Sequence, residues 1–175
     1  MTATRRIVLV GLPGSGKSTV GPLVAAALGW PFVDLDEAIV RAAGQSIPEV
    51  FAAEGEVGFR LREREVTAGL GQLGPVVLAP GGGWLLDPFN LGALGGALLV
   101  VYLEVSPEVA AARIGGEGGG RPLLAGGDLA SRLADLLRQR KNLYLQANHT
   151  VSVDSLSPDG VAAYIVALAT GRTAD

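Results

Sequence analysis

Cysteine is absent from the 175 residues, and histidine occurs only once. The absence of cysteine excludes disulfides, thiolate nucleophiles and cysteine-ligated metals, and it is typical of proteins from a reducing compartment. The single histidine, His149, lies at the start of an apolar segment, and we interpret it as structural. Basic residues (14) are outnumbered by acidic ones (17), so the formal net charge is −3. This balance does not indicate a nucleic-acid partner.

Long apolar runs are also missing. No uninterrupted run reaches the roughly 18 residues that a membrane-spanning helix requires, and the apolar segment behind Arg5 and Arg6 is too short for a signal peptide. We therefore expect a cytoplasmic protein without a membrane partner. Hydrophobic residues nevertheless make up 49% of the chain, which excludes a disordered protein. The length and the lack of repeats or linkers predict a single domain over residues 1–175.

Residues 11–19 have the sequence G-L-P-G-S-G-K-S-T, which matches G-x-x-x-x-G-K-[ST]. Such a loop wraps backbone N–H groups around a phosphate chain, and the dipole of the following helix favours the same charge. We expect Lys17 to reach the β- and γ-phosphates and Ser18 to ligate Mg²⁺. A chance glycine turn is the alternative, but a β-branched run directly precedes the motif and a helix-compatible segment follows it. The predicted nucleotide contacts are Gly14, Ser15, Gly16, Lys17, Ser18 and Thr19.

The rest of the chain alternates between short apolar runs and longer helical patterns. A glycine-rich segment, about residues 115–127, interrupts this alternation and has the composition of a mobile lid. Strands separated by helices predict an α/β fold in three layers, a parallel five-stranded sheet with helices on both faces. The expected strands are 7–10, 32–34, 75–79, 98–104 and 149–153. The expected helices are 17–28, 36–43, one opening at Ser46, 56–73, one capped by Ser106, 128–146 and one starting at Ser157.

Two acidic residues, Asp34 and Asp36, end the second predicted strand. Ligands bind at the carboxyl ends of strands in such sheets, and residues i and i+2 of a strand face the same side. One carboxylate is therefore expected to support Mg²⁺ and the other to accept a proton from a substrate hydroxyl. The alternative is that Asp36 only caps the next helix.

A helix around Arg60 carries several charges of both signs. Most of them, including Arg62, Arg64 and Glu65, fit a solvated helix face. Arg60 differs because Glu56 and Glu63 lie four and three residues away, where they can orient its guanidinium group. Further along, three glycines at 81–83 follow a strand and predict that a ligand approaches the backbone closely there. A flexible turn is the alternative for that segment.

The chain resembles the shikimate kinase family along nearly its whole length. The P-loop alone indicates only nucleotide binding, whereas the ordered set of motifs is far more specific. The matching segments are G-L-P-G-S-G-K-S-T (11–19), D-L-D (34–36), G-Q-S-I-P-E-V-F (44–51), G-E-V-G-F-R (55–60), G-G-G (81–83), R-P-L-L (121–124) and R-x-x-L-Y (140–144).

This resemblance implies ATP- and Mg²⁺-dependent phosphorylation of the 3-hydroxyl of shikimate, a step toward chorismate and the aromatic amino acids. It implies that Arg60 and Arg140 hold the shikimate carboxylate, and that Arg121 reaches from the lid to the phosphates. Arg113 would lie near the adenine. The implied shikimate contacts are Asp36, Arg60, Gly82 and Arg140; the implied catalytic residues are Lys17, Asp36 and Arg121; the implied metal-site residues are Ser18 and Asp34.

Three other functions remain to be weighed. A gluconate kinase shares the P-loop and the lid but not the set formed by Asp36, Arg60 and Arg140. A regulatory GTPase requires N-K-x-D, which is absent, and a non-catalytic nucleotide-binding module is expected to lack Lys17, Asp36 or Arg121.

The chain departs from the family pattern at Pro80 and by one extra residue in the lid. We expect a monomer.

Overall fold

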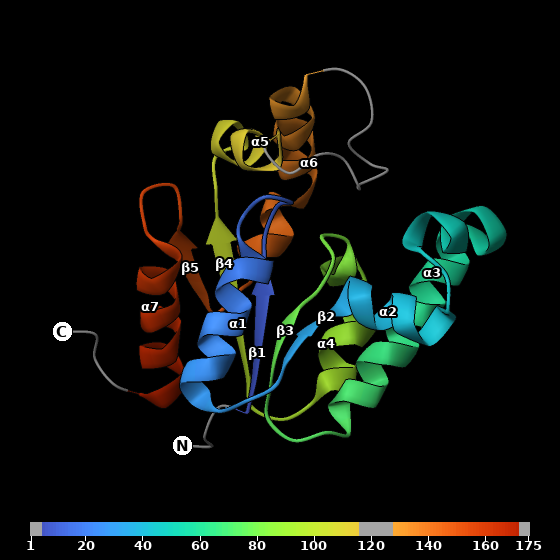
Figure 1. The fold of residues 1–175 in the computed structure, drawn as a ribbon, viewed down its shortest axis with the longest axis horizontal. Helices are drawn as coiled ribbons and strands as arrows, with labels where there is room; N and C mark the ends of the chain where they lie inside the picture. Colours follow the sequence, from blue (N-terminus) through green and yellow to red (C-terminus); the bar gives the residue numbers. More distant parts are fainter. Residues whose placement is uncertain (1–4, 116–127, 172–175) are drawn as a thin grey trace.

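The computed structural model describes residues 5–115 and 128–171. Five strands form one sheet in the order β2-β3-β1-β4-β5, and every neighbouring pair is parallel. All carboxyl ends therefore lie along one edge of the sheet, the upper edge in Figure 1. The five predicted strands are confirmed, with shifts of one residue at some ends. They are β1 (Arg6–Val10), β2 (Phe32–Asp34), β3 (Val76–Ala79), β4 (Leu98–Glu104) and β5 (His149–Ser152).

Helices connect the strands, and most of them agree with the sequence prediction. The helix predicted to end at Leu73 ends instead at Gly71, and it continues from the preceding helix across a break at Gly55 (φ 68°). The described helices are α1 (Lys17–Leu28), α2 (Leu35–Ala43), α3 (Ile47–Gly71), the 3-10 turn η1 (Trp84–Leu86), α4 (Pro88–Leu94), α5 (Pro107–Gly115), α6 (Leu129–Tyr144) and α7 (Pro158–Thr170).

The segment between β3 and β4 was not assigned from the sequence. It contains η1 and α4, whose short apolar stretches carry no clear helical period. Asp87 caps α4 by accepting a hydrogen bond from the N–H of Phe89 at 3.1 Å, and Pro88 occupies the first turn. An aspartate followed by proline is a helix-start signal that was available in the sequence.

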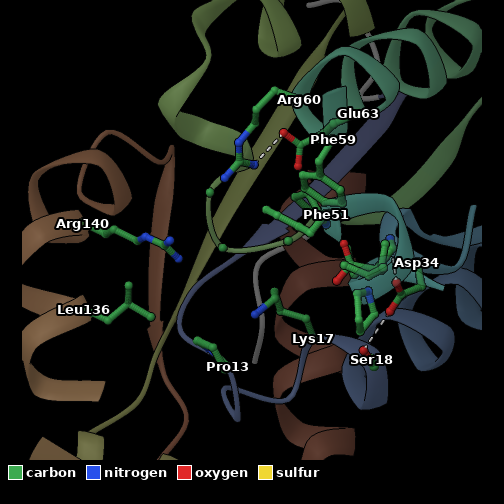
Figure 2. Close-up of a pocket in the computed structure, with 18 residues that line it drawn as sticks. Pro13, Lys17, Ser18, Asp34, Phe51, Phe59, Arg60, Glu63, Leu136 and Arg140 are labelled. Atoms are coloured by element: carbon green, nitrogen blue, oxygen red, sulfur yellow. Dashed lines mark hydrogen bonds and ion pairs between the residues drawn. The ribbon is translucent and has the colours of Figure 1, made fainter. Parts of the chain in front are cut away.

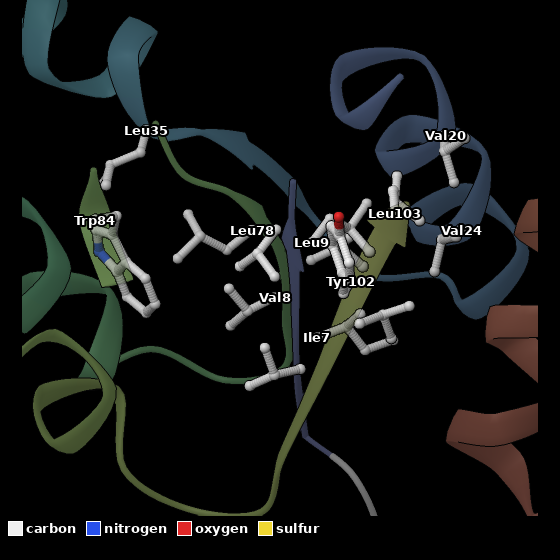
Figure 3. Close-up of a cluster of buried hydrophobic side chains, with 14 of the residues drawn as sticks. Ile7, Val8, Leu9, Val20, Val24, Leu35, Leu78, Trp84, Tyr102 and Leu103 are labelled. Atoms are coloured by element: carbon white, nitrogen blue, oxygen red, sulfur yellow. The ribbon is translucent and has the colours of Figure 1, made fainter. Parts of the chain in front are cut away.

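The core lies on both faces of the sheet. The central strand β1 is buried throughout, and its alternating side chains point to opposite faces. Figure 3 shows Val8 on the same side as Trp84, whereas Ile7 lies on the side of Val20 and Val24 from α1. Helices α1 and α7 pack beside each other on that second side. The predicted three-layer α/β fold is confirmed, and it fixes the upper edge on which the loops converge.

Two capped helix starts lie near that edge. Glu49 Oε2 accepts a hydrogen bond from the Ser46 N–H at 2.7 Å, so the predicted capping box at the start of α3 is confirmed. Asp128 caps α6 through the N–H groups of Ala130 and Ser131. Both caps fix the entry of a helix that carries a candidate site arginine. None of the helices described is long and apolar enough to span a membrane.

Candidate active site

The P-loop follows β1 and leads into α1. Gly14 has φ 80°, which a residue with a side chain rarely adopts, and a Cβ there would stand 2.7 Å from the carbonyl oxygen of Ala110 in α5. This glycine is therefore needed both for the turn and for the packing of the loop against α5. Gly16 (φ 93°) immediately precedes α1, so the helix N-terminus faces the hollow of the loop.

Lys17 is half-buried and folds back over the loop. Its Nζ donates hydrogen bonds to the carbonyl oxygens of Gly11 and Leu12, each at 2.9 Å, and to Ser15 Oγ at 3.3 Å. The ammonium group therefore already lies within the loop that would hold the phosphates. The buried Ser15 hydroxyl faces inward, so the structure gives this side chain a role in shaping the loop.

Ser18 and Asp34 bring the P-loop and the end of β2 together. The Ser18 hydroxyl donates to Asp34 Oδ2 at 3.1 Å. The other oxygen of Asp34 accepts from the N–H groups of Asp36 at 3.0 Å and Glu37 at 3.3 Å, so Asp34 is the N-cap of α2. A hydroxyl and a carboxylate at a helix N-terminus are hard oxygen donors, which suit Mg²⁺ bound together with phosphate oxygens.

The strand argument for Asp36 is wrong. Asp36 belongs to the first turn of α2 and not to β2, so the i, i+2 alternation does not apply to it. Nor does Asp36 cap the helix, because Asp34 performs that role. Both carboxylates nevertheless line one cavity, because the β2–α2 junction turns at the carboxyl edge of the sheet.

That cavity has a volume of about 410 Å³ and opens beside the P-loop. It contains all six of the residues predicted for substrate or metal binding, together with Lys17. The charged and polar lining residues beside the P-loop, together with one glycine, are Lys17, Ser18, Asp34, Asp36, Arg60, Gly82 and Arg140. Residues from α1, β2, α2, α3, β3 and α6 thus meet at one place, at the carboxyl edge of the sheet.

Two arginines enter the cavity from different helices, Arg60 from α3 and Arg140 from α6 (Figure 2). Arg60 pairs with Glu63 at 2.9 Å and with Glu56 at 3.6 Å, as the sequence spacing predicted. Arg140 is only 9% exposed, and within residues 5–115 and 128–171 it forms no ion pair. A buried cation without a carboxylate partner is costly. This arrangement therefore favours binding of an anion in the cavity.

Glu63 is the buried partner of this pair. Its side chain is 1% exposed, and only one of its oxygens accepts the hydrogen bond from Arg60. Burial raises the pKa of Glu63 above 4.5, and the charge of Arg60 offsets only part of this rise. Glu63 therefore orients Arg60. Because its pKa is raised, it neutralises the charge of Arg60 less fully than an exposed carboxylate would.

The three glycines form the floor beneath the charged groups. A Cβ on Gly81 would stand 3.2 Å from Asp36 Oδ1, and one on Gly83 would stand 2.9 Å from Arg60 Cζ. A Cβ on Gly82 would lie under 3.0 Å from Arg140 Nη1. Each glycine thus lies directly below one predicted substrate-binding side chain. The close approach of these side chains argues against a flexible turn, whereas the predicted approach of a ligand to the glycines stays a prediction.

An aromatic wall was missed at the sequence level. Phe51 and Phe59 stack with ring centroids 4.7 Å apart, and both line the cavity. The guanidinium of Arg60 lies 5.4 Å from the centroid of the Phe59 ring. Both phenylalanines belong to motif segments quoted above, yet their position at helical spacing also fits an ordinary core. The wall gives the cavity an apolar side next to Arg60.

Comparisons with known proteins agree with this geometry. A sequence model described as shikimate kinase matches residues 13–170. The chain belongs to the shikimate kinase family. A shikimate kinase from Synechococcus sp. (strain RCC307) is 51% identical over 146 residues, which are 83% of this chain and 74% of that protein.

Solved structures separate the shikimate kinases from a sister family. Shikimate kinase from Acinetobacter baumannii in complex with shikimate is 38% identical, covers 94% of this chain and 92% of its own, and superposes with a TM-score of 0.86. A gluconokinase from Sinorhizobium meliloti 1021 covers 98% of this chain and 92% of its own, but it is only 22% identical, with a TM-score of 0.56. The gluconokinase shares the fold alone.

Arg113, which the shikimate kinase resemblance places near the adenine, is not among the residues that line the cavity. Arg113, on α5, donates to the carbonyl oxygens of Gly14 at 3.4 Å and Val153 at 2.7 Å. It therefore lies between the P-loop and the end of β5. Arg121 and nearly all of the predicted lid fall in residues 116–127, outside the described part of the chain. His149, at the start of β5, is exposed and is not among the residues that line the cavity.

Proposed function

We propose that this shikimate kinase family member transfers the γ-phosphoryl group of MgATP to the 3-hydroxyl of shikimate. The observation that supports this most strongly is the convergence of Arg60 and Arg140 on one cavity beside Lys17 of the P-loop. The two guanidinium groups provide forks for a planar carboxylate, and the P-loop provides the phosphate site. A single cavity therefore holds an anionic acceptor next to a phosphoryl donor.

On the acceptor side, Arg60 and Arg140 bind the carboxylate and fix the orientation of the ring. The rings of Phe51 and Phe59 pack against its apolar face. Asp36, above Gly81, accepts the proton of the attacking hydroxyl. Because the carboxylate and the reacting hydroxyl are held at two separate points of one ring, the site selects which hydroxyl faces the P-loop.

On the donor side, Lys17 and the N-terminus of α1 stabilise the negative charge that moves during transfer. Ser18 and Asp34 would hold Mg²⁺, which neutralises phosphate charge when bound. Gly14, Ser15, Gly16 and Thr19 complete the loop, and Arg113 borders it toward β5. We propose that Arg121 enters from the lid to stabilise the transferring group and that lid closure excludes water.

A test compares acceptors. ADP release from MgATP is measured by a coupled assay with shikimate, quinate, gluconate and AMP at equal concentrations. We expect shikimate to give a specificity constant at least about a hundredfold above gluconate and AMP, since a site built for particular hydroxyls and a carboxylate leaves polar groups unpaired with other acceptors. A higher value with gluconate or AMP would refute the acceptor assignment and leave the nucleotide site intact.

We also propose that the enzyme acts as a monomer in the cytoplasm. One chain supplies every described residue of the cavity, so phosphoryl transfer requires no partner residue in this account. Light scattering after size exclusion, run with and without shikimate, measures the mass in solution. A stable dimer would contradict the monomer proposal without bearing on the reaction.

A further inference from the structure

Tyr144 is the last residue of α6, one helical turn after Arg140. The side chain is 1% exposed, and its ring stacks on Tyr102 of β4 with centroids 5.0 Å apart and an interplanar angle of 24°. Because residues four apart on a helix share one face, Tyr144 and Arg140 lie side by side. The ring is therefore held by the sheet, and the hydroxyl lies near the arginine.

The hydroxyl has no ordinary structural role. Although the atom is buried, no described residue meets ordinary hydrogen-bond geometry with Tyr144 Oη, and Arg140 makes only a weaker contact with it. It stands 3.5 Å from the position that a Cβ on Gly82 would occupy, and Arg140 Nη1 lies next to the same position. Burial raises the pKa of Tyr144, and the charge of Arg140 and its weak hydrogen-bonding contact with the hydroxyl oppose part of that rise. The oxygen and the guanidinium are thus neighbours whose approach stops short of a full hydrogen bond.

This geometry is unfavourable for the ligand-free protein. A buried phenolic hydroxyl usually has a partner, and leaving one without a partner destabilises the fold. Phenylalanine would retain the stacking on Tyr102 and remove this unfavourable group. The hydroxyl therefore does not stabilise the ligand-free fold. Any contribution it makes must arise in a state in which Arg140 has moved.

We propose that Tyr144 is a positioning residue for Arg140, a role that rests on the proposed function. Its hydroxyl oxygen accepts one guanidinium N–H when the carboxylate of the acceptor draws Arg140 into its bound position. Arginine has five N–H donors in a fixed plane and no acceptor. One donor fixed by Tyr144 leaves the remaining donors aligned with the carboxylate. The glycine at position 82 leaves room for both side chains to meet beneath the bound ring.

The test uses Tyr144→Phe, with Tyr102→Phe as a matched control that removes a hydroxyl from the same stacked pair. We expect Tyr144→Phe to raise KM for shikimate about tenfold, the loss of one hydrogen bond to a charged group. KM for MgATP should stay unchanged. The melting temperature of the ligand-free variant should equal or exceed that of wild type, while its rise on adding shikimate should shrink. Tyr102→Phe should keep the wild-type KM for shikimate.

A double-variant cycle separates positioning from packing. In an Arg140→Ala background, Tyr144→Phe should change KM for shikimate no further, because the hydroxyl acts only through Arg140. The proposal is overturned if Tyr144→Phe alone leaves KM and the shikimate-induced shift unchanged, if Tyr102→Phe raises KM equally, or if the two effects add. Wild-type protein that fails to phosphorylate shikimate refutes the proposed function itself. If the wild-type protein phosphorylates shikimate and Tyr144→Phe has the wild-type KM for shikimate, only the positioning role is refuted.

Discussion

Gly82→Ala separates the shape of the acceptor site from the stability of the fold. Gly82 has no positive φ, so alanine fits its backbone without strain. The new Cβ, however, would lie under 3.0 Å from Arg140 Nη1 and 3.5 Å from Tyr144 Oη. Ordinary contacts begin at 3.4 Å, so the guanidinium must shift by up to about 1 Å. The tip of a long side chain can make such a move without unfolding the protein.

The shift should weaken acceptor binding specifically. Misplacing the guanidinium of Arg140 weakens its hydrogen bonds to the carboxylate and costs about 1.5–3 kcal/mol of binding free energy. This corresponds to a rise of about 10- to 100-fold in KM for shikimate. KM for MgATP should stay within about twofold because Gly82 lies on the acceptor side of the cavity. The melting temperature should be unchanged or slightly higher, since alanine restricts the unfolded chain.

The assay is steady-state ADP release with shikimate and MgATP varied in turn. Gly69→Ala provides the control, because Gly69 is exposed within α3 and a Cβ there meets nothing within 4 Å. That variant should gain about 0.5–1 kcal/mol of stability and retain wild-type kinetics. If Gly82→Ala keeps the wild-type KM for shikimate, the close approach of Arg140 to the glycine floor has no part in acceptor binding.

Other substitutions probe the remaining parts of the site. Lys17→Ala should lower kcat at least about a hundredfold with circular dichroism unchanged, and a near-normal kcat would remove Lys17 from the mechanism. Arg60→Ala should weaken shikimate binding by about 2–3 kcal/mol in calorimetry, whereas ATP affinity should not change. For Glu63, the raised pKa means that the folded state binds the proton more tightly, so the free energy of unfolding falls as pH rises through and above 4.5. Glu63→Gln should remove that fall. In urea denaturation, the free energy of unfolding of the variant relative to wild type should therefore be higher at about pH 8 than at about pH 5. The same difference in unfolding free energy at both pH values would contradict the assigned shift.

The regular elements were predictable because their signals are local. Capping residues such as Ser46, Asp128 and Ser157 precede helical patterns, and β-branched runs mark the buried strands. The segment around η1 and α4 lacked such a period, so only the Asp87–Pro88 pair marked a helix there. Sheet order was not predictable in the same way, because it depends on which strands pack across the core and not on any local pattern.

The site divides along similar lines. The P-loop and the end of the second strand placed Lys17 and Asp34 at the carboxyl edge of the sheet, and the family resemblance implied that Arg60 and Arg140 belong to the same site. All four line one cavity. The place of Asp36 was predicted correctly for a wrong reason, because a strand period was extended into a helix. Long-range approaches could not be read from the sequence, which has no signal for a tyrosine hydroxyl lying next to a glycine 62 positions earlier in the chain. Such contacts depend on tertiary packing.

The central claim is that this cavity directs the 3-hydroxyl of shikimate at the P-loop. Two-dimensional ³¹P–¹H correlation NMR of the product formed from shikimate and MgATP tests it directly. The account predicts a phosphorus signal coupled to the proton on C3, formed in step with ADP. Coupling to a proton on another ring carbon, or inorganic phosphate as the only phosphorus product, would contradict it.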